Sequence, residues 1–201
     1  MNYRIWMSLG MVGLIAASAA IGAETGAVID RHLCSVCHGR GGTTSSELFP
    51  HLAAEPAPYL IAQLKAFRDK SRSDQNAQRF MWGIASRLSD EEIQNLAAYY
   101  ASQPAVHQEK ISDQSKYDSG KNIFMSGHSD KGVPACKFCH GEKGEGNETT
   151  PRLGGQNEAY LKRQLKVFYG NERPAATAMH EIVKGLSESD VEALAHYLQA
   201  Q

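Results

Sequence analysis

The chain has 201 residues, a formal net charge of −1 and a sequence pI near 6.7, an ordinary balance for a globular protein. This charge gives no indication of a nucleic-acid partner. All four cysteines lie in two copies of one short motif, so the chemistry of the cysteines is the first question that the sequence raises.

Residues 1–23 are expected to form a cleavable signal peptide. Arg4 precedes an apolar run from Ile5 to Ile21 that carries no charge, and the small residues from Ala17 to Ala23 offer a cleavage site. An uncleaved membrane anchor is the alternative, but the run is short for a full span and its end is rich in Ala and Ser. We therefore expect the chain to be exported.

The first half of the mature chain is expected to contain three helices. One lies before the first cysteine, around Gly26 to Leu33. A second is indicated by side chains that recur on one face between Tyr59 and Phe67. The third starts at a capping box, in which Ser89 is followed three residues later by Glu92. No stretch alternates with the period of a strand, so the fold class predicted is all-α.

The second half repeats these elements. The segment "PHLAAEPAPYLIAQLKAF" from Pro50 matches "PRLGGQNEAYLKRQLKVF" from Pro151, and Ser187 with Asp190 repeats the capping box. A further helix is expected from Tyr117 to Ser126, before the second cysteine motif. These matches indicate an internal duplication.

Two tandem domains follow from the duplication, residues 24–104 and residues 105–201. The segment 102–120 between the repeats is polar and aperiodic, so we expect a linker on the surface at the start of the second domain. Each domain is small enough that a buried cofactor would supply much of its apolar contact.

The cysteine motif reads "CSVCHG" from Cys34 and "CKFCHG" from Cys136. Paired thiols in an exported protein usually form disulfides, and four thiolates are also the ligands of a structural zinc ion. Neither alternative explains why a histidine follows the second cysteine in both copies. Cys-x-x-Cys-His is the attachment signature of c-type haem, in which both sulfurs bond to the porphyrin and the histidine ligates the iron. The sequence therefore predicts two haem c groups, covalently bound by Cys34, Cys37, Cys136 and Cys139 and ligated by His38 and His140.

Methionine is the expected sixth ligand of each iron. Met81 and Met179 occupy matching contexts, each with Leu-Ser seven residues later, whereas Met125 has no counterpart and is expected to fill the core. His180 is the rival ligand in the second half, but its counterpart in the first half is Trp82. A histidine and methionine pair is typical of electron-carrying cytochromes c.

Other residues around the motifs have weaker predicted roles. Pro50 and Pro151 are placed where a backbone carbonyl accepts the Nδ1 proton of the proximal histidine. His51 and Arg152 follow these prolines and are candidates for hydrogen bonds to haem propionates. Tyr59 and Tyr160 are interpreted as core residues with a polar tip.

The whole mature chain resembles the dihaem cytochromes c4, which consist of two class I cytochrome c domains in tandem. The two Cys-x-x-Cys-His motifs, Met81, Met179 and the "PRLGGQ" segment from Pro151 carry this resemblance. The first half departs from that segment with Ala53, Ala54 and Glu55. The resemblance implies a periplasmic electron carrier, often associated with the inner membrane, that feeds a terminal oxidase and has its haems related by an approximate twofold axis.

The expected function is outer-sphere electron transfer between redox proteins, from a respiratory donor complex to a terminal oxidase or reductase, with both axial ligands retained. The chain is therefore expected to be a carrier rather than an enzyme. A cytochrome subunit of a periplasmic dehydrogenase is the alternative. A dihaem peroxidase is disfavoured, because it needs an open sixth position on an iron and two matched methionines argue against one.

Overall fold

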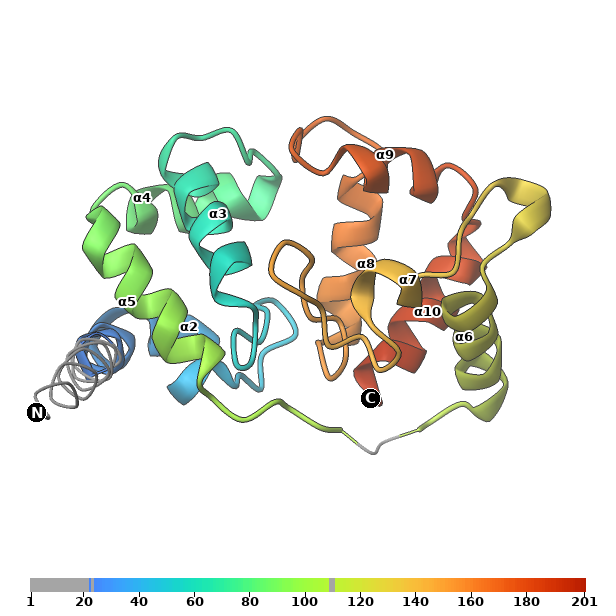
Figure 1. Ribbon diagram of the computed structural model, residues 1–201, viewed down its shortest axis with the longest axis horizontal. Coiled ribbons are helices and arrows are strands. Elements are labelled where there is room, and N and C mark those ends of the chain that lie inside the picture. The colour runs from blue at the N-terminus through green and yellow to red at the C-terminus, as the bar shows by residue number, and fades with distance from the viewer. Residues whose placement is uncertain (1–21, 23, 109–110) are drawn as a thin grey trace, which may run out of the picture.

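The computed structural model describes residues 22, 24–108 and 111–201, so the expected signal peptide lies outside the described part of the chain apart from Gly22. The described residues contain helices and no strand, with one isolated antiparallel bridge between His128 and Val133. Figure 1 shows two helical halves side by side, joined by an extended segment along one edge. None of the described helices is long and apolar enough to cross a membrane. The all-α prediction is confirmed.

The first half contains the three predicted helices and a further helical segment at residues 77–85 that was not predicted. Residues 24–29 are helical and continue into the π-helical turn η1 (Asp30–Cys34) and then α2 (Ser35–His38). The later elements are η2 (Arg40–Gly42), α3 (Ala57–Arg68), η3 (Ala77–Met81), α4 (Trp82–Ala85) and α5 (Asp90–Ala101). The capping box of α5 is confirmed, because Ser89 Oγ accepts from the Glu92 N–H while the Glu92 carboxylate accepts from the Ser89 N–H.

The second half repeats this arrangement. Its elements are α6 (Gln114–Ser126), η4 (Ser129–Lys131), α7 (Lys137–His140), α8 (Glu158–Val167), α9 (Thr177–Val183) and α10 (Glu188–Gln199). Ser187 and Asp190 form the second predicted capping box, at the start of α10.

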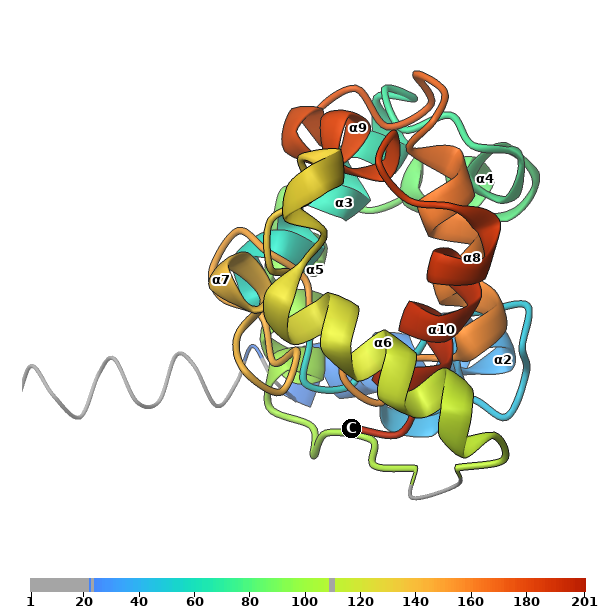
Figure 2. The same cartoon turned by 90° about the vertical axis from the view of Figure 1, so that its right-hand side faces the viewer.

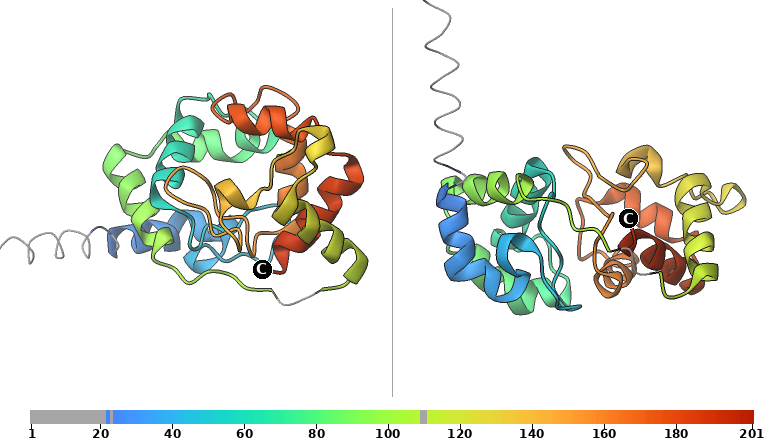
Figure 3. Two further views of the ribbon diagram at one scale, coloured as in Figure 1. Left: turned by 45° about the vertical axis from the view of Figure 1, so that its right-hand side comes forward. Right: turned by 90° about the horizontal axis from the view of Figure 1, so that it is seen from below.

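The segment expected to be linker is shorter than predicted. Helix α6 begins at Gln114, because the Asp113 side chain accepts a hydrogen bond from the Lys116 N–H and so caps the helix. The expected linker therefore ends at Asp113, and the helix expected from Tyr117 begins three residues earlier, at Gln114. Seen from below, the segment after α5 runs from the first half to the second and passes near the C-terminus (Figure 3).

In each half the first and last helices cross at a glycine. A Cβ at Gly26 would lie 2.3 Å from the Asn95 carbonyl oxygen, and one at Gly120 would lie 2.0 Å from the Ala193 carbonyl oxygen. Figure 2 shows α6 lying across α10 in the second half. The close approach of the backbones requires a residue without a side chain at each crossing.

The buried apolar side chains gather around these crossings. In the second half they form one large cluster, which includes Ile123, Phe124, Leu161 and Leu194. In the first half they form two clusters, one around Ile93 and Leu96 and the other around Phe67, Ala77 and Ala85.

Candidate haem-binding sites

The cysteine motifs lie on one short helix in each half. Cys34 is the last residue of η1 and Cys37 lies one turn later in α2, while Cys136 caps α7 and Cys139 lies within it. Both helices stop directly after the histidine, where a glycine has a positive φ of 72° (Gly39) or 81° (Gly141). Helix and glycine together place two thiols and an imidazole on one turn of chain.

None of the four cysteines, which all lie in the described part of the chain, is joined in a disulfide. Burial raises the pKa of Cys34, and it raises the pKa of Cys136 to about 11. A redox-active Cys-x-x-Cys pair has a lowered pKa instead. The described residues also contain no group of three or more His, Cys, Asp or Glu side chains placed to hold a metal ion, so the four thiols do not gather into one zinc site.

The two motif histidines are buried and held in the same way. His38 Nδ1 lies 3.0 Å from the Pro50 carbonyl oxygen, and His140 Nδ1 lies 3.0 Å from the Pro151 carbonyl oxygen. Because a carbonyl can only accept, each Nδ1 carries the proton and each Nε2 is left with a lone pair for a metal. Burial lowers the pKa of both rings, so both are neutral, as ligation requires. This donor set fits haem iron.

The matched methionines lie in corresponding helices. Met81 is the last residue of η3 and packs against the cluster of Phe67, Ala77 and Ala85. Met179 lies in α9 and is also half-buried. Met125 packs against the apolar cluster of the second half, in agreement with a core role.

His180, the rival ligand, has neither ring nitrogen free. Its Nδ1 lies 2.7 Å from the Phe168 carbonyl oxygen and its Nε2 lies 3.0 Å from that of Arg173. In the first half, Trp82 Nε1 donates to the Arg72 carbonyl oxygen at 2.9 Å. His180 therefore has the same structural role as Trp82. Each side chain hydrogen-bonds to a carbonyl oxygen of the preceding loop and so holds the helix of the methionine against that loop.

Aromatic rings link the two sides of the first site. The rings of His38 and Phe49 are 5.8 Å apart, and those of Phe49 and Phe80 are 5.3 Å apart. Phe80 directly precedes Met81, so this series of rings runs from the histidine side to the methionine side. The matching positions of the second half hold Thr150 and Ala178, and the two sites therefore differ in their surroundings.

The residues after the prolines are held by loop contacts. His51 is buried, and its Nδ1 accepts a hydrogen bond from the Thr44 N–H at 3.2 Å. Arg152 Nε donates to the Gly154 carbonyl oxygen at 2.9 Å. The propionate contacts expected of His51 and Arg152 stay a prediction.

A buried polar network joins the halves, and sequence reasoning missed it. Arg72 donates to Gln63 Oε1 of its own half at 2.8 Å and to Gln164 Oε1 of the other half at 3.0 Å. It lies 3.5 Å from the Tyr160 hydroxyl and is paired with the buried carboxylate of Asp74 at 3.0 Å. A buried arginine with these partners fixes the orientation of the two halves.

Arg173 of the second half makes the equivalent contacts with the first half. It donates to Gln164 Oε1 at 2.7 Å, to Gln63 Oε1 at 3.2 Å and to the Tyr59 hydroxyl at 3.1 Å. Tyr59 and Tyr160 thus direct their polar tips to arginines of the opposite half, a contact that their interpretation as core residues did not include. The polar residues of this network recur in the sequence 101 positions apart, and that repeat is the signal from which the network could have been predicted.

Comparison with known proteins agrees with these sites. A profile of the cytochrome c family matches residues 23–103 and again residues 117–201. Cytochrome c4 of Stutzerimonas stutzeri is 32% identical over 96% of this chain and 94% of its own length. The chain belongs to the dihaem cytochrome c4 family. It is accordingly an electron carrier with two haem c groups, from a family of electron-transfer proteins rather than enzymes, and its partners are redox proteins.

Other members of the cytochrome c4 family and its relatives extend this picture. A solved structure of Acidithiobacillus ferrooxidans cytochrome c4 has a TM-score of 0.78 and 37% identity, and the match covers 84% of this chain and 98% of that one. A relative from Thiomonas intermedia is described as a thiosulfate dehydrogenase electron acceptor. It is 32% identical over 84% of this chain and 78% of its own length.

Proposed function

We propose that this cytochrome c4 carries electrons in the periplasm, from a respiratory donor complex to a terminal oxidase or reductase. Residues 1–23 direct export, residues 24–104 and 105–201 each hold one haem, and the protein associates peripherally with the inner membrane. The observation that carries the proposal is the pair of buried histidines, each directly after a Cys-x-x-Cys pair and each fixed by a proline carbonyl at 3.0 Å.

Each site residue has a defined role in this proposal. The thiols of Cys34, Cys37, Cys136 and Cys139 hold the two haems covalently. His38 and His140 ligate through Nε2, while Pro50 and Pro151 fix the ring orientation and make the imidazoles more basic. Met81 and Met179 would each supply one iron with a thioether, a soft ligand that favours the reduced state.

Haem c supplies a one-electron ferric and ferrous couple when bound. The chain keeps both axial ligands in place as the charge changes, because the histidine tautomer is fixed and the helices around the ligands are packed. It also excludes water from the ligand side, where His38 and His140 are each 7% exposed.

Mass spectrometry of the exported protein tests the proposal. Two haem additions that survive denaturation are expected, one on each cysteine pair. Replacing Cys34 and Cys37 together with alanine should remove one addition, and replacing Cys136 and Cys139 should remove the other. A disulfide or four free thiols in the exported protein would contradict the assignment.

A dehydrogenase partner is the second candidate function. It is favoured by the relatives described as thiosulfate dehydrogenase electron acceptors, and by a likeness to thiosulfate dehydrogenase of Marichromatium purpuratum at 26% identity and a TM-score of 0.77. The cytochrome then accepts electrons from a periplasmic dehydrogenase. Co-purification of the tagged protein with a flavin- or metal-bearing enzyme would favour this function over that of a free carrier.

A further inference from the structure

A single peptide group connects each proximal histidine to the opposite half of the molecule. In the first half, the Pro50 carbonyl accepts from His38 Nδ1 at 3.0 Å. The N–H of the same peptide group belongs to His51 and donates to Gln156 Oε1 at 2.8 Å. The side chain of Gln156 therefore acts on the ligand of the first haem although it belongs to the second half.

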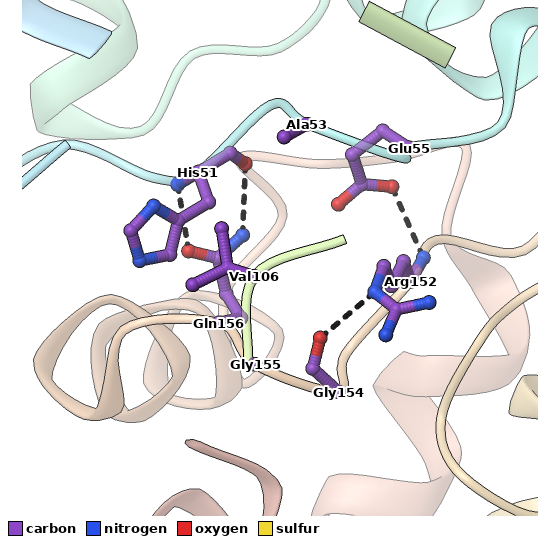
Figure 4. Close-up of a pocket in the computed structure, with 8 residues that line it drawn as sticks. All are labelled: His51, Ala53, Glu55, Val106, Arg152, Gly154, Gly155 and Gln156. Atoms are coloured by element: carbon purple, nitrogen blue, oxygen red, sulfur yellow. Dashed lines mark hydrogen bonds between the residues drawn. The ribbon is translucent and has the colours of Figure 1, made fainter. Parts of the chain in front are cut away.

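The second half has the reciprocal arrangement. The Pro151 carbonyl accepts from His140 Nδ1 at 3.0 Å, and the N–H of that peptide group, on Arg152, donates to Glu55 Oε2 at 3.0 Å. Figure 4 shows Glu55 directed at Arg152 and Gln156 directed at His51.

The two acceptors occupy equivalent positions of the repeat but differ in chemistry. Gln156 is an amide, and its Nε2 donates to the His51 carbonyl oxygen at 2.9 Å while its Oε1 accepts. Glu55 is a carboxyl group, which can donate in the same manner only when it is protonated. The amide keeps one charge state at every pH, whereas the carboxyl group has two.

Glu55 is placed where both of its charge states are accessible. Its side chain is 6% exposed and has no ion pair within the described part of the chain. Burial raises its pKa to about 8, against the opposing effects of the Arg152 N–H and of the Arg152 and Arg173 charges. The other titratable group that faces it is the Tyr59 hydroxyl, and Glu55 also lines a cavity of about 10 Å³ together with His51 and Arg152. That cavity has room for about one water molecule, which gives a proton a route to the carboxyl group.

We propose that Glu55 is a positioning residue for the second haem, and that loss of its proton lowers the reduction potential of that haem through the Pro151–Arg152 peptide group. This inference rests on the proposed role of His140 as an iron ligand. An ionised carboxylate binds the Arg152 N–H more strongly and polarises the peptide group. The Pro151 carbonyl then accepts more strongly from His140, and a more basic imidazole favours ferric iron.

Electron and proton uptake are thereby coupled at the second site. At a pH above the pKa of Glu55, a bound haem would take up one electron from the redox partner while the Glu55 carboxylate takes up one proton from solvent and becomes the neutral acid. The first site has no such coupling through Gln156, because the amide does not titrate. The two haems therefore respond differently to pH although their ligands are the same.

The test is a pair of substitutions in the haem-loaded protein, Glu55→Gln and Gln156→Glu. The potential of each haem is measured against pH by redox titration followed by nuclear magnetic resonance, with the two haems assigned from Met81→His and Met179→His variants. In the natural protein the reduction equilibrium constant of the second haem should fall by about tenfold as the pH rises past the pKa of Glu55, which is about 59 mV for one electron.

Glu55→Gln should abolish this pH dependence at the second haem, and Gln156→Glu should create one at the first haem. The infrared carbonyl stretch of a protonated carboxylic acid should be present in the natural protein at neutral pH and absent from Glu55→Gln. Glutamine already occupies the equivalent position 156, so Glu55→Gln is expected to fold.

A pH dependence of the second haem that Glu55→Gln leaves unchanged would overturn the inference, as would a pH-independent potential in the natural protein. Either result would leave the two-haem proposal standing if mass spectrometry finds both additions. A missing haem on Cys136 and Cys139 would instead overturn the proposed function itself.

Discussion

Alanine at Gly120 should destabilise the second half, and the structure gives the size of the effect. The new Cβ would lie 2.0 Å from the Ala193 carbonyl oxygen and 2.7 Å from Tyr197 Cβ, and both neighbours belong to α10. Neither is the flexible end of a side chain, so α6 and α10 must move apart. Overpacking costs about 1–3 kcal/mol, and the better helix propensity of alanine returns about 1 kcal/mol. We expect a net loss of about 2 kcal/mol, because a contact with backbone at 2.0 Å belongs at the upper end of the range.

The matched control is Gly83→Ala in α4. Gly83 is exposed, and a Cβ there meets nothing within 4 Å, so the substitution should stabilise the protein by about 0.5–1 kcal/mol. Thermal unfolding of the haem-loaded protein, followed by far-UV circular dichroism, measures both variants. A change of 1 kcal/mol shifts the midpoint of a domain of this size by roughly 4–8 °C. An unfolding temperature of Gly120→Ala equal to or above that of the natural protein would refute the close crossing of α6 and α10.

Three further predictions concern the haem ligands and the interface between the halves. Met81→His and Met179→His should each lower the potential of one haem and remove about half of the far-red absorption of the ferric protein, with both haems still attached; an unchanged spectrum in either variant would contradict the assignment of that ligand. Ala54→Gly should raise the free energy of unfolding, measured with denaturant, by about 1 kcal/mol. Ala54 has a positive φ of 57°, and this left-handed conformation costs about 1 kcal/mol for a residue with a Cβ but not for glycine. A loss of stability would show that the loop is not strained. Since burial raises the pKa of Glu55 from 4.5 to about 8, the folded protein binds this proton more tightly than the unfolded chain, and stability should fall as the pH rises through that window. Glu55→Gln should remove this fall in the thermal midpoint, and an identical pH profile in both proteins would count against it.

Local patterns were sufficient to predict three helices in each half, but not η3 with α4 or α9, which carry the two methionines. Ser89 with Glu92 specifies a helix start through two short-range hydrogen bonds, and the structure contains both. The glycines after each Cys-x-x-Cys-His motif stop α2 and α7 in the same way. Helix α6 starts three residues before the predicted Tyr117, because Asp113 caps it within a segment whose apolar pattern is weak.

The contacts between the halves could not be read from periodicity. Tyr59 lies on the face of α3 where a core side chain is expected, and helical spacing alone does not distinguish the core of one domain from a surface that meets the other. Arg72 and Arg173 lie in loops without periodicity, and their shared network depends on how the two domains are oriented. Their equivalence within the repeat was visible in the sequence, but the partner of each became clear only in three dimensions.

The crossed hydrogen bonds of Glu55 and Gln156 have an evolutionary consequence. A freshly duplicated gene encodes two self-sufficient copies, and either copy can then be lost. Here each copy has become part of the other's ligand environment, so deleting one half would remove a hydrogen-bond acceptor from the peptide group that holds the remaining histidine. A substitution at position 55 or 156 therefore changes the contacts of both halves, so neither copy is free to change at these positions without affecting the other.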